Sequence, residues 1–585
     1  MHVIFEDAGK FLGGRILSES DASAQVELDT GKRVKVKAPH IVLRFDQPAA
    51  GPLLTQAQSA SLEIDLDLAW ECAPEQEFGF AELARDYFGD GCTLSEQAAM
   101  LLRLHEAPHY FRRAGKGRFR KADAEVVQQA LAAIEKKQRL QAQIEQWALE
   151  LAQGVCPSQV QAQIFRLLFK PDKNSAEYKA LVSAARQTQL PPLTLLQRTG
   201  AIGSAYQFHW QRFLFEYFPK GIEFPALDAP TVSEDLPRAD VVAYSIDDSE
   251  TTEIDDALSV QGLGTGVVTL GIHIAAPGLA LKPGEALDTL ARARLSTVYM
   301  PGQKITMLPD AVVQRYTLAE GQDCPAVSLY VRFDESTLAV LEHHTRLERV
   351  PIGANMRHDQ LDAGVTPEWL QDPDVPWGLK TPPPAMPKEP LSWLYRLALH
   401  LKQQREQVRG KPEQFNRPDY TFRVLGIEAG GIQGHEPVEI TTRRRGAPLD
   451  LMVAEAMILA NSTWGAWMAS LGVPAIYRSQ ASLAPGVKVR MGSKSLPHAG
   501  IGVASYAWST SPLRRYTDLV NQWQIIACVR HGATAALAAP FQPKSVELMS
   551  VIASFETAYA AYNAHQSQME RYWRSEEHTS ELQSH

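Results

Sequence analysis

Cysteine is scarce in this chain, and no two cysteines are closely spaced. The five cysteines among the 585 residues are Cys72, Cys92, Cys156, Cys324 and Cys528, so no Cys-x-x-Cys pair exists. Zinc ribbons need such pairs, and disulfide scaffolds need a high density of cysteines in a short chain. The sequence therefore argues against both classes, and the cytoplasm is the expected compartment.

Long apolar runs are also missing. No stretch approaches the roughly 20 apolar residues that a helix needs to cross a bilayer. Glu6 and Asp7 lie near the N-terminus, where a secretory signal would carry an apolar segment. We therefore expect no membrane partner for this chain.

Positive charge is in deficit, because 58 Lys and Arg face 67 Asp and Glu for a formal net charge of −9. Proteins that bind polynucleotides usually carry a basic surface, so the composition does not identify the partner. Basic residues gather only locally, at 32–37, 112–121 and 443–445. Each of these clusters is also compatible with a solvated face or turn.

The chain is too long for one hydrophobic core, and its patterning predicts an α+β protein of several domains. Residues 1–50 alternate like short strands between turn signals, which predicts a small β-barrel and candidate RNA-binding module. By the period of two, Arg33, Lys35 and Lys37 share one face of it. Residues 51–77 are predicted to form a linker.

In residues 78–220, apolar residues recur at three- and four-residue spacing, which predicts a helical region. Basic, aromatic and glycine residues interleave at 110–120, just before the helix expected after Asp123. This pattern resembles the wing of a winged-helix module, and an exposed basic loop fits it equally well. We take three residues here as candidate RNA-binding residues: Arg112, Arg113 and Lys116.

Proline-rich residues 221–235 mark a boundary. Beyond them, strand and helix patterns mix over residues 236–550, which predicts one mixed α/β catalytic domain. Residues 551–573 are predicted to begin a helical connection to a further domain.

An acidic block stands out within the mixed domain. Six carboxylates fall between Asp247 and Asp256, with apolar residues on both sides. Clustered carboxylates repel one another unless cations neutralise them, and Mg²⁺ typically takes one or two carboxylates plus phosphate oxygens. An EF-hand does not fit, because counting from Asp247 puts Thr252 at its Gly position and Leu258 at its Glu position. The chemistry alone leaves a metal site and an acidic surface loop as alternatives.

The block resembles the signature of the RNase II/RNase R (RNB) family, in which acidic ligands follow an Ile-Asp opening by six, eight and nine residues. Those offsets fall on Asp247, Glu253, Asp255 and Asp256. Four more segments resemble family motifs in the family's order: Tyr299-Met300-Pro301 with Met307-Leu308-Pro309, Asn416-Arg417-Pro418-Asp419-Tyr420, Val453 to Asn461, and Thr510-Ser511-Pro512-Leu513-Arg514-Arg515-Tyr516-x-Asp518. The resemblance spans roughly residues 236–533, about half of the chain.

The resemblance implies a 3′-to-5′ hydrolytic exoribonuclease that degrades single-stranded RNA to nucleoside 5′-monophosphates. Two Mg²⁺ ions would activate water and stabilise the phosphorus centre and the leaving oxygen. The roles implied are metal ligation for Asp247, Glu253 and Asp256, contact with the terminal ribose or the attacking water for Asp255, and binding of phosphoryl oxygens for Arg514. The alternative for Arg514 is an ion pair with Asp518.

The resemblance also places three residues beside the RNA: His358, Glu455 and Tyr516. His358 stands where the RNase II branch has a Tyr that stacks on the last base, and imidazole can stack too. Glu455 lies on an apolar helix, where a surface carboxylate is the alternative. A monomer without a small-molecule cofactor is implied.

Four positions depart from the family pattern, namely Glu253 for Asp, His358 for Tyr, Ala276 for Asp and Gln522 for His. Glu253 reaches one methylene further, which favours tolerance of Mn²⁺ beside Mg²⁺. Typical members also begin with two cold-shock-type barrels, where this chain has one small barrel and a helical region. The pattern indicates a divergent branch of the family.

Residues 574–585 read as the translation of a common DNA-sequencing adapter. We therefore expect the native chain to continue past Trp573 into the family's C-terminal OB-fold domain. An authentic polar tail is the alternative. Two functional rivals stay open, an RNA-binding protein with the RNB fold and little catalysis, and a two-metal enzyme that acts on DNA.

Overall fold

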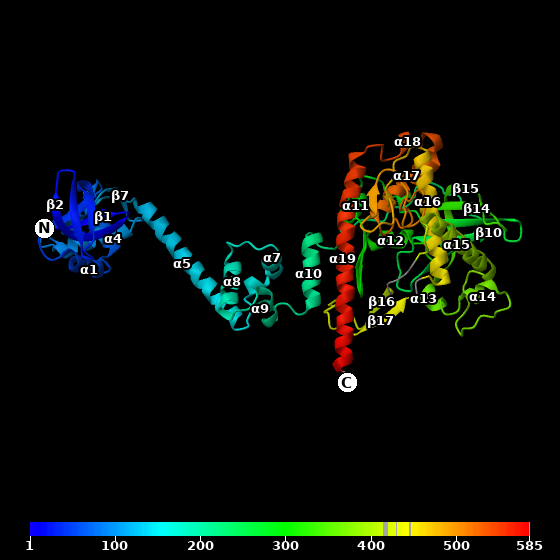
Figure 1. Cartoon of the computed structure of the whole chain (residues 1–585), viewed down its shortest axis with the longest axis horizontal. Helices are drawn as coiled ribbons and strands as arrows, with labels where there is room; N and C mark the ends of the chain where they lie inside the picture. The colour runs from blue at the N-terminus through cyan, green and yellow to red at the C-terminus, as the bar shows by residue number, and fades with distance from the viewer. Residues whose placement is uncertain (414–418, 429, 444–445, 584–585) are drawn as a thin grey trace. The chain divides into compact units, whose positions relative to one another are not determined.

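The computed structural model describes residues 1–413, 419–428, 430–443 and 446–583 (Figure 1). The chain divides into two compact units, Met1–Ala201 and Ile202–His585. Sheets and helices alternate in both units, which confirms the multidomain α+β class. None of the described helices combines the length and the apolar character that a membrane span requires.

Unit 1 begins with a five-stranded antiparallel sheet in the order β4-β3-β2-β1-β5. The strands are β1 (His2–Asp7), β2 (Lys10–Glu19), β3 (Ser23–Leu28), β4 (Arg33–Lys37) and β5 (Ile41–Phe45). They lie where the alternation predicts them, because Val3, Phe5 and Val26 share a buried core. β4 and β5 are the two edges of this sheet, so it differs from a fully closed barrel.

Residues 51–77, expected to be a linker, instead carry two helices, α1 (Ala50–Ser61) and α2 (Leu66–Cys72). Leu53 and Ala57, one turn apart, are fully buried, and α1 packs on α4 (Leu94–Glu106). The periodic apolar pattern of a helix is weak in this segment, because most of the residues that α1 buries are small. Alanine and glutamine nevertheless have high helix propensity, which explains the helix.

The rest of unit 1 follows the helix–strand–helix–helix–hairpin order of a winged-helix module. After α1 and α2 come β6 (Phe78–Gly79), α3 (Phe80–Phe88), α4, β7 (Phe111–Gly115) and β8 (Arg118–Lys121), with strand order β6-β8-β7. In that order of elements, the β7–β8 hairpin stands at the position of the predicted wing. The remaining helices are α5 (Ala124–Ala152), α6 (Ser158–Gln161), α7 (Ile164–Phe169), α8 (Ala176–Thr188) and α9 (Pro192–Arg198).

Unit 2 is built on a closed barrel with the strand order β10-β11-β14-β15-β9. The strands are β9 (Ala243–Asp247), β10 (Asp256–Gln261), β11 (Val267–Ala275), β14 (Asp323–Asp334) and β15 (Val340–Arg357). Consecutive strands pair antiparallel, whereas β9 and β15 pair in parallel and close the barrel. Parallel pairing brings the ends of both strands to one edge, so Asp247 lies beside Arg357.

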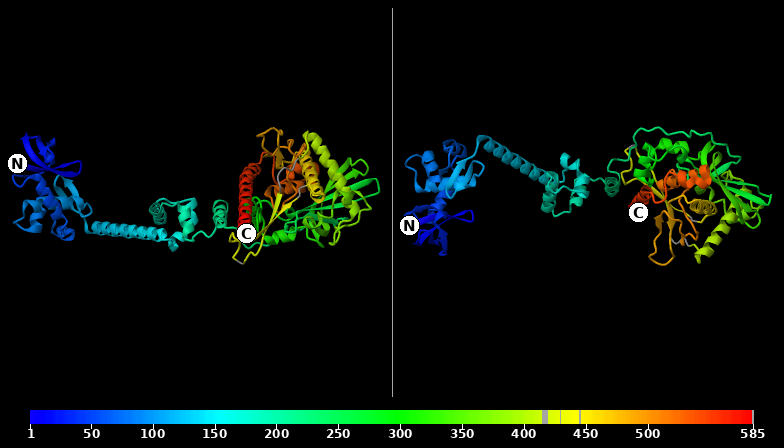
Figure 2. Two further views of the ribbon diagram at one scale, coloured as in Figure 1. Left: turned by 60° about the horizontal axis from the view of Figure 1, so that its bottom comes forward. Right: turned by 90° about the horizontal axis from the view of Figure 1, so that it is seen from above.

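Helices and short hairpins surround this barrel. The helices are α10 (Ala205–Tyr217), α11 (Ala286–Arg294), α12 (Asp310–Tyr316), α13 (His358–Leu361), α14 (Pro367–Gln371), α15 (Lys388–Arg409), α16 (Pro448–Ser470), α17 (Tyr516–His531), α18 (Ala535–Ala538) and α19 (Val546–Gln583). The hairpins pair β12 (Val298–Met300) with β13 (Gln303–Ile305), β16 (Asp419–Val424) with β17 (Val438–Arg443), and β18 (Tyr477–Ser479) with β19 (Arg490–Gly492). The central helix α17 is buried along most of its length and contacts β15, α16 and α19. Figure 2 gives two further views, in which the long helix α19 is red.

Candidate active site

A cavity of about 760 Å³ opens at the barrel edge where β9 and β15 end. Its lining comes from five parts of unit 2, namely the end of β9 with the acidic block, the β12–β13 hairpin, His358, β16 with the start of α16, and Arg514 with α19. The acidic residues Asp247, Glu253, Asp255 and Asp256 all line it. The cavity therefore gathers most of the segments that the sequence singled out.

The loop between β9 and β10 is held by hydrogen bonds from outside itself. The guanidinium of Arg357, at the end of β15, donates to the carbonyl oxygen of Asp248 at 2.7 Å and to that of Thr251 at 3.3 Å. The Ile254 N–H donates to Thr317 Oγ1 at 2.8 Å. These anchors fix the backbone between the carboxylates, so their side chains leave the loop in defined directions.

Asp255 and Arg514 form an ion pair in the cavity wall. Arg514 Nε donates to Asp255 Oδ2 at 3.0 Å, and the Leu513 N–H donates to Asp255 Oδ1 at 2.9 Å. Burial raises the pKa of Asp255 to about 7, although Arg514 acts in the opposite direction. The alternative partner of Arg514, Asp518, is instead paired with Arg515 at 2.7 Å.

Asp247 and Asp256, the other two aspartates of the cavity wall, have fewer hydrogen-bond donors than Asp255. The Oδ2 atom of Asp247 is buried and has no hydrogen-bond partner among the described residues. Burial and then the negative charge of Asp247 raise the pKa of Asp256 to about 8. Two repelling carboxylates, one with an orphaned oxygen, fit a divalent cation, which would neutralise them and use that oxygen.

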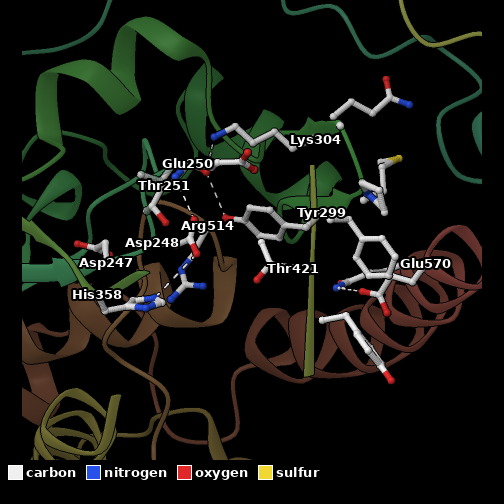
Figure 3. A pocket seen from close by; sticks show the side chains of 18 of the residues that line it. Asp247, Asp248, Glu250, Thr251, Tyr299, Lys304, His358, Thr421, Arg514 and Glu570 are labelled. Carbon is white, nitrogen blue, oxygen red and sulfur yellow. Dashed lines mark hydrogen bonds and ion pairs between the residues drawn. The ribbon is translucent and has the colours of Figure 1, made fainter. Parts of the chain in front are cut away.

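Glu253 faces a different set of partners. Its buried carboxylate accepts hydrogen bonds from Thr297 Oγ1 at 3.2 Å, Tyr299 Oη at 3.1 Å and Lys304 Nζ at 2.8 Å. In Figure 3, Lys304 and Tyr299 approach the cavity from the hairpin, whereas Asp247 lies with His358. Among the described residues, no three His, Cys, Asp or Glu side chains form a ready metal cluster. The predicted three-ligand set is therefore not assembled.

His358, predicted to contact RNA, lines the cavity but is largely buried. Its Nε2 atom lies 3.9 Å from Asp248 Oδ2, and its Nδ1 atom lies 3.6 Å from Asp362 Oδ2. α13 begins at His358 directly after β15, so the position of the imidazole follows from the end of the barrel strand. The imidazole thus lies at the cavity wall between two carboxylates.

Two other predicted RNA-binding residues do not line the cavity. Glu455 is buried in a two-point ion pair with Arg405, and Tyr516 is a core residue that donates to Asp288. Both were selected from motif position, which does not show the direction of a side chain. On α16, it is Asp450 and Val453 that reach the cavity.

The predicted basic residues of the wing lie in unit 1. Glu6 pairs with Arg113 at 3.4 Å and with Lys116 at 3.1 Å, while Arg112 is exposed on β7. Other basic and motif positions, Asn416 to Pro418 and Arg444 with Arg445, lie outside the described residues. Tyr420, at the end of that motif, lines the cavity.

Two of the departures from the family pattern have structural explanations. Gln522 donates to the Ala275 carbonyl at 2.8 Å and accepts from the Gly278 N–H at 2.8 Å. Ala276 is fully buried between these two points. Gln522 therefore ties α17 to the end of β11, and neither position lines the cavity.

Sequence reasoning missed Lys304 and gave Tyr299 no role. Both lie in a hairpin whose Pro301-Gly302 turn places Gly302 at a φ of 78°. The Pro-Gly pair signals such a turn, and the resulting register puts Tyr299 opposite Lys304. The turn could have been read from the sequence, but the contact with Glu253 could not.

Comparisons with known proteins match the part of the chain that contains this site. The model of the RNB domain matches residues 237–486 and 482–531. An uncharacterized ribonuclease of Synechocystis sp. is 29% identical over 385 residues, which are 60% of this chain and 51% of that protein. Exoribonuclease 2 of Proteus mirabilis is 25% identical over 370 residues, 53% of this chain and 54% of that protein. The chain thus spans about half the length of the curated relatives it matches.

A solved structure shares the fold over nearly the whole chain. The crystal structure of an active-site mutant of the Dss1 exoribonuclease from Candida glabrata superposes with a TM-score of 0.59 at 16% identity, covering 98% of this chain and 88% of that one. The family model itself matches half of the present chain. On this match the chain belongs to the RNB family, which includes RNase II and RNase R.

Proposed function

We propose that the chain is a divalent-metal-dependent exoribonuclease that hydrolyses single-stranded RNA from the 3′ end to nucleoside 5′-monophosphates. The observation that carries this proposal is the convergence of Asp247, Asp256 and the Asp255–Arg514 pair on one cavity. The exoribonucleases among its relatives support the reaction class.

Asp247 and Asp256 would hold a Mg²⁺ ion, because they supply carboxylate oxygens and one of these has no other partner. When bound, such an ion acts as a Lewis acid on the phosphoryl oxygens and lowers the pKa of its water. Mn²⁺ demands less strict geometry and should be accepted too. The two-metal arrangement predicted from the sequence also requires Glu253, which already has three donors.

Arg514 would bind the phosphoryl oxygens of the scissile linkage. Its Nε donates to Asp255 and its Nη2 to Ser511 Oγ at 3.0 Å, so the guanidinium plane is fixed before RNA arrives. The Arg514 side chain is 41% exposed, so its charge faces the cavity despite the ion pair. A fixed positive group at the developing charge is the main electrostatic contribution to phosphoryl transfer. Asp255 acts in this scheme by orienting Arg514.

The cavity also carries aromatic surface for the terminal nucleotides. Tyr299, Tyr420 and Phe422 line it together with His358. Aromatic faces stack on bases of any sequence, which suits an enzyme that advances along single strands. Arg112, Arg113 and Lys116 of unit 1 are proposed as additional contacts to RNA phosphates.

The test is degradation of 5′-labelled single-stranded RNA and of the matching DNA, with and without Mg²⁺. We expect metal-dependent shortening of RNA with release of nucleoside 5′-monophosphates. Because 2′-hydroxyls distinguish RNA from DNA, deoxyribose near the 3′ end should slow cleavage strongly. Tight RNA binding without turnover would instead indicate an RNA-binding protein with this fold, and equal rates on DNA would indicate a general nuclease.

A further inference from the structure

Lys304 brings a positive charge into the acidic site from the β12–β13 hairpin. Tyr299 and Lys304 are directly opposite in the register, so their side chains leave the hairpin on the same face. Both donate to the same oxygen of Glu253, Oε2, at 3.1 and 2.8 Å. Lys304 Nζ also donates to Thr252 Oγ1 at 2.6 Å, which fixes the ammonium at this end of the loop.

This set of donors leaves Glu253 little capacity for a metal. A carboxylate has about four lone-pair sites, and Thr297, Tyr299 and Lys304 use three of them. A divalent ion on Glu253 would also lie next to the ammonium, and two cations at such short range repel each other. Glu253 is 3% exposed, so bulk water would screen this repulsion poorly.

The other end of the loop has the opposite character. Asp247 Oδ2 is buried without a partner, and no ammonium or guanidinium of the described residues makes an ion pair with Asp247 or Asp256. A carboxylate oxygen at this end is therefore still available to a cation. The four carboxylates thus fall into three groups: Glu253 with Lys304, Asp255 with Arg514, and Asp247 with Asp256.

We propose that Lys304 takes the place of a second divalent cation, so that the chain binds a single divalent ion, at Asp247 and Asp256. The inference rests on the proposed function, because it concerns the same site. Lys304 is a positioning residue in this scheme. It fixes Glu253, and through Glu253 the loop that carries the metal-binding carboxylates. The longer Glu and the lysine act as one unit.

The experiment counts Mn²⁺ bound to the whole chain, by the loss of the electron paramagnetic resonance signal of free Mn²⁺. The titration is done alone and with a 2′-O-methylated RNA oligonucleotide, with the oligonucleotide by itself as the blank. We expect one Mn²⁺ per chain under both conditions. Two ions per chain, with or without RNA, would overturn the proposal whatever the variants do.

Three variants then assign the effect to Lys304. Lys304→Met removes the ammonium and keeps the length of the side chain, so Glu253 loses its cationic partner while Thr297 and Tyr299 still donate to it, and a second, weaker Mn²⁺ should bind. Lys304→Arg keeps the charge, so this variant should bind one Mn²⁺ per chain. The double variant, Lys304→Met with Glu253→Gln, should also bind only one. Lys282→Met, at an exposed lysine of the same unit, is the matched control and should not differ from the parent.

The outcomes separate this inference from the proposed function. A single ion in Lys304→Met, with an unchanged melting profile, would show that Lys304 does not exclude the second ion and would overturn the inference. An RNA-degrading chain that binds two ions overturns the inference and leaves the exoribonuclease function standing. A chain that binds one ion, and two after Lys304→Met, but degrades no RNA would uphold the inference and overturn the function.

Discussion

Two ion pairs of unit 2, each between an arginine and a buried carboxylate, differ in how far the arginine side chain is exposed. Arg514 with Asp255 and Arg405 with Glu455 both place a carboxylate that is almost inaccessible against a guanidinium. The Arg514 side chain is 41% exposed, whereas that of Arg405 is 8% exposed. The first pair therefore presents charge to the cavity, and the second uses its charge within the fold. Ion-pair chemistry alone does not distinguish a catalytic pair from a structural one.

The largest effect that separates the two pairs should be the loss of RNA turnover in Asp255→Asn. The amide keeps the shape and can still accept from Arg514, but it removes the charge that orients the guanidinium. We expect turnover to fall about 100- to 1,000-fold, the range for loss of an electrostatic contact in the transition state. Single-turnover cleavage of labelled RNA measures this. RNA affinity should stay within about twofold and the melting temperature should not fall; parent-like turnover would remove Asp255 from the site.

Glu455→Gln should give the reverse pattern. It leaves the buried Arg405 without its two-point partner, although Glu413 remains 3.3 Å away. Breaking a buried pair typically costs about 3–5 kcal/mol, and we expect about 3 kcal/mol here because Glu413 stays. Urea unfolding followed by circular dichroism measures the loss. The folded fraction should cleave RNA at the parent rate, and a loss of turnover without a loss of stability would return Glu455 to the active site.

Metal binding should depend on pH through the carboxyls that lack an ammonium partner. The pKa of Asp256 is raised from 3.8 to about 8, so the metal-free folded chain loses stability as the pH rises toward 8. A divalent ion must displace that proton below this pH. Mg²⁺ should therefore raise the melting temperature more at about pH 8.5 than at about pH 6. Differential scanning calorimetry tests this, and Asp256→Asn should abolish the dependence; an equal shift at both pH values would exclude Asp256 as a ligand.

The smallest effect is expected in unit 1, where arginines differ in having an acidic partner. Arg112 is exposed, whereas Arg113 pairs with Glu6. If the wing binds RNA, Arg112→Ala should weaken binding about two- to fivefold and reduce the salt dependence by about one phosphate contact. Fluorescence anisotropy over a salt series measures both. Arg186→Ala, at an exposed arginine of α8, is the matched control, and an unchanged salt slope for Arg112→Ala would exclude the wing contact.

The sequence predicted positions along the chain better than it predicted directions of side chains. The spacing of the carboxylates after Asp247 predicted residues that line the cavity. The alternation of apolar and polar residues predicted the strands at the start of unit 1. Glu455 and Tyr516 lie outside the cavity lining, because both are on buried faces of their helices. Lys304 was missed because its role depends on the hairpin register, and the α1 segment was missed because alanine contacts give a weak apolar period.

The parallel pairing of β9 with β15 has a consequence for the order in which the molecule folds. Arg357 and the loop carbonyl that it holds, that of Asp248, lie 109 positions apart in the chain. Closing so long a segment costs conformational entropy before any contact compensates for it, so such pairings form slowly. The antiparallel run from β10 to β15 can form first through neighbouring strands. Asp247 and His358 come together only when β9 docks, so competence to bind a divalent ion should be gained in the last step of folding.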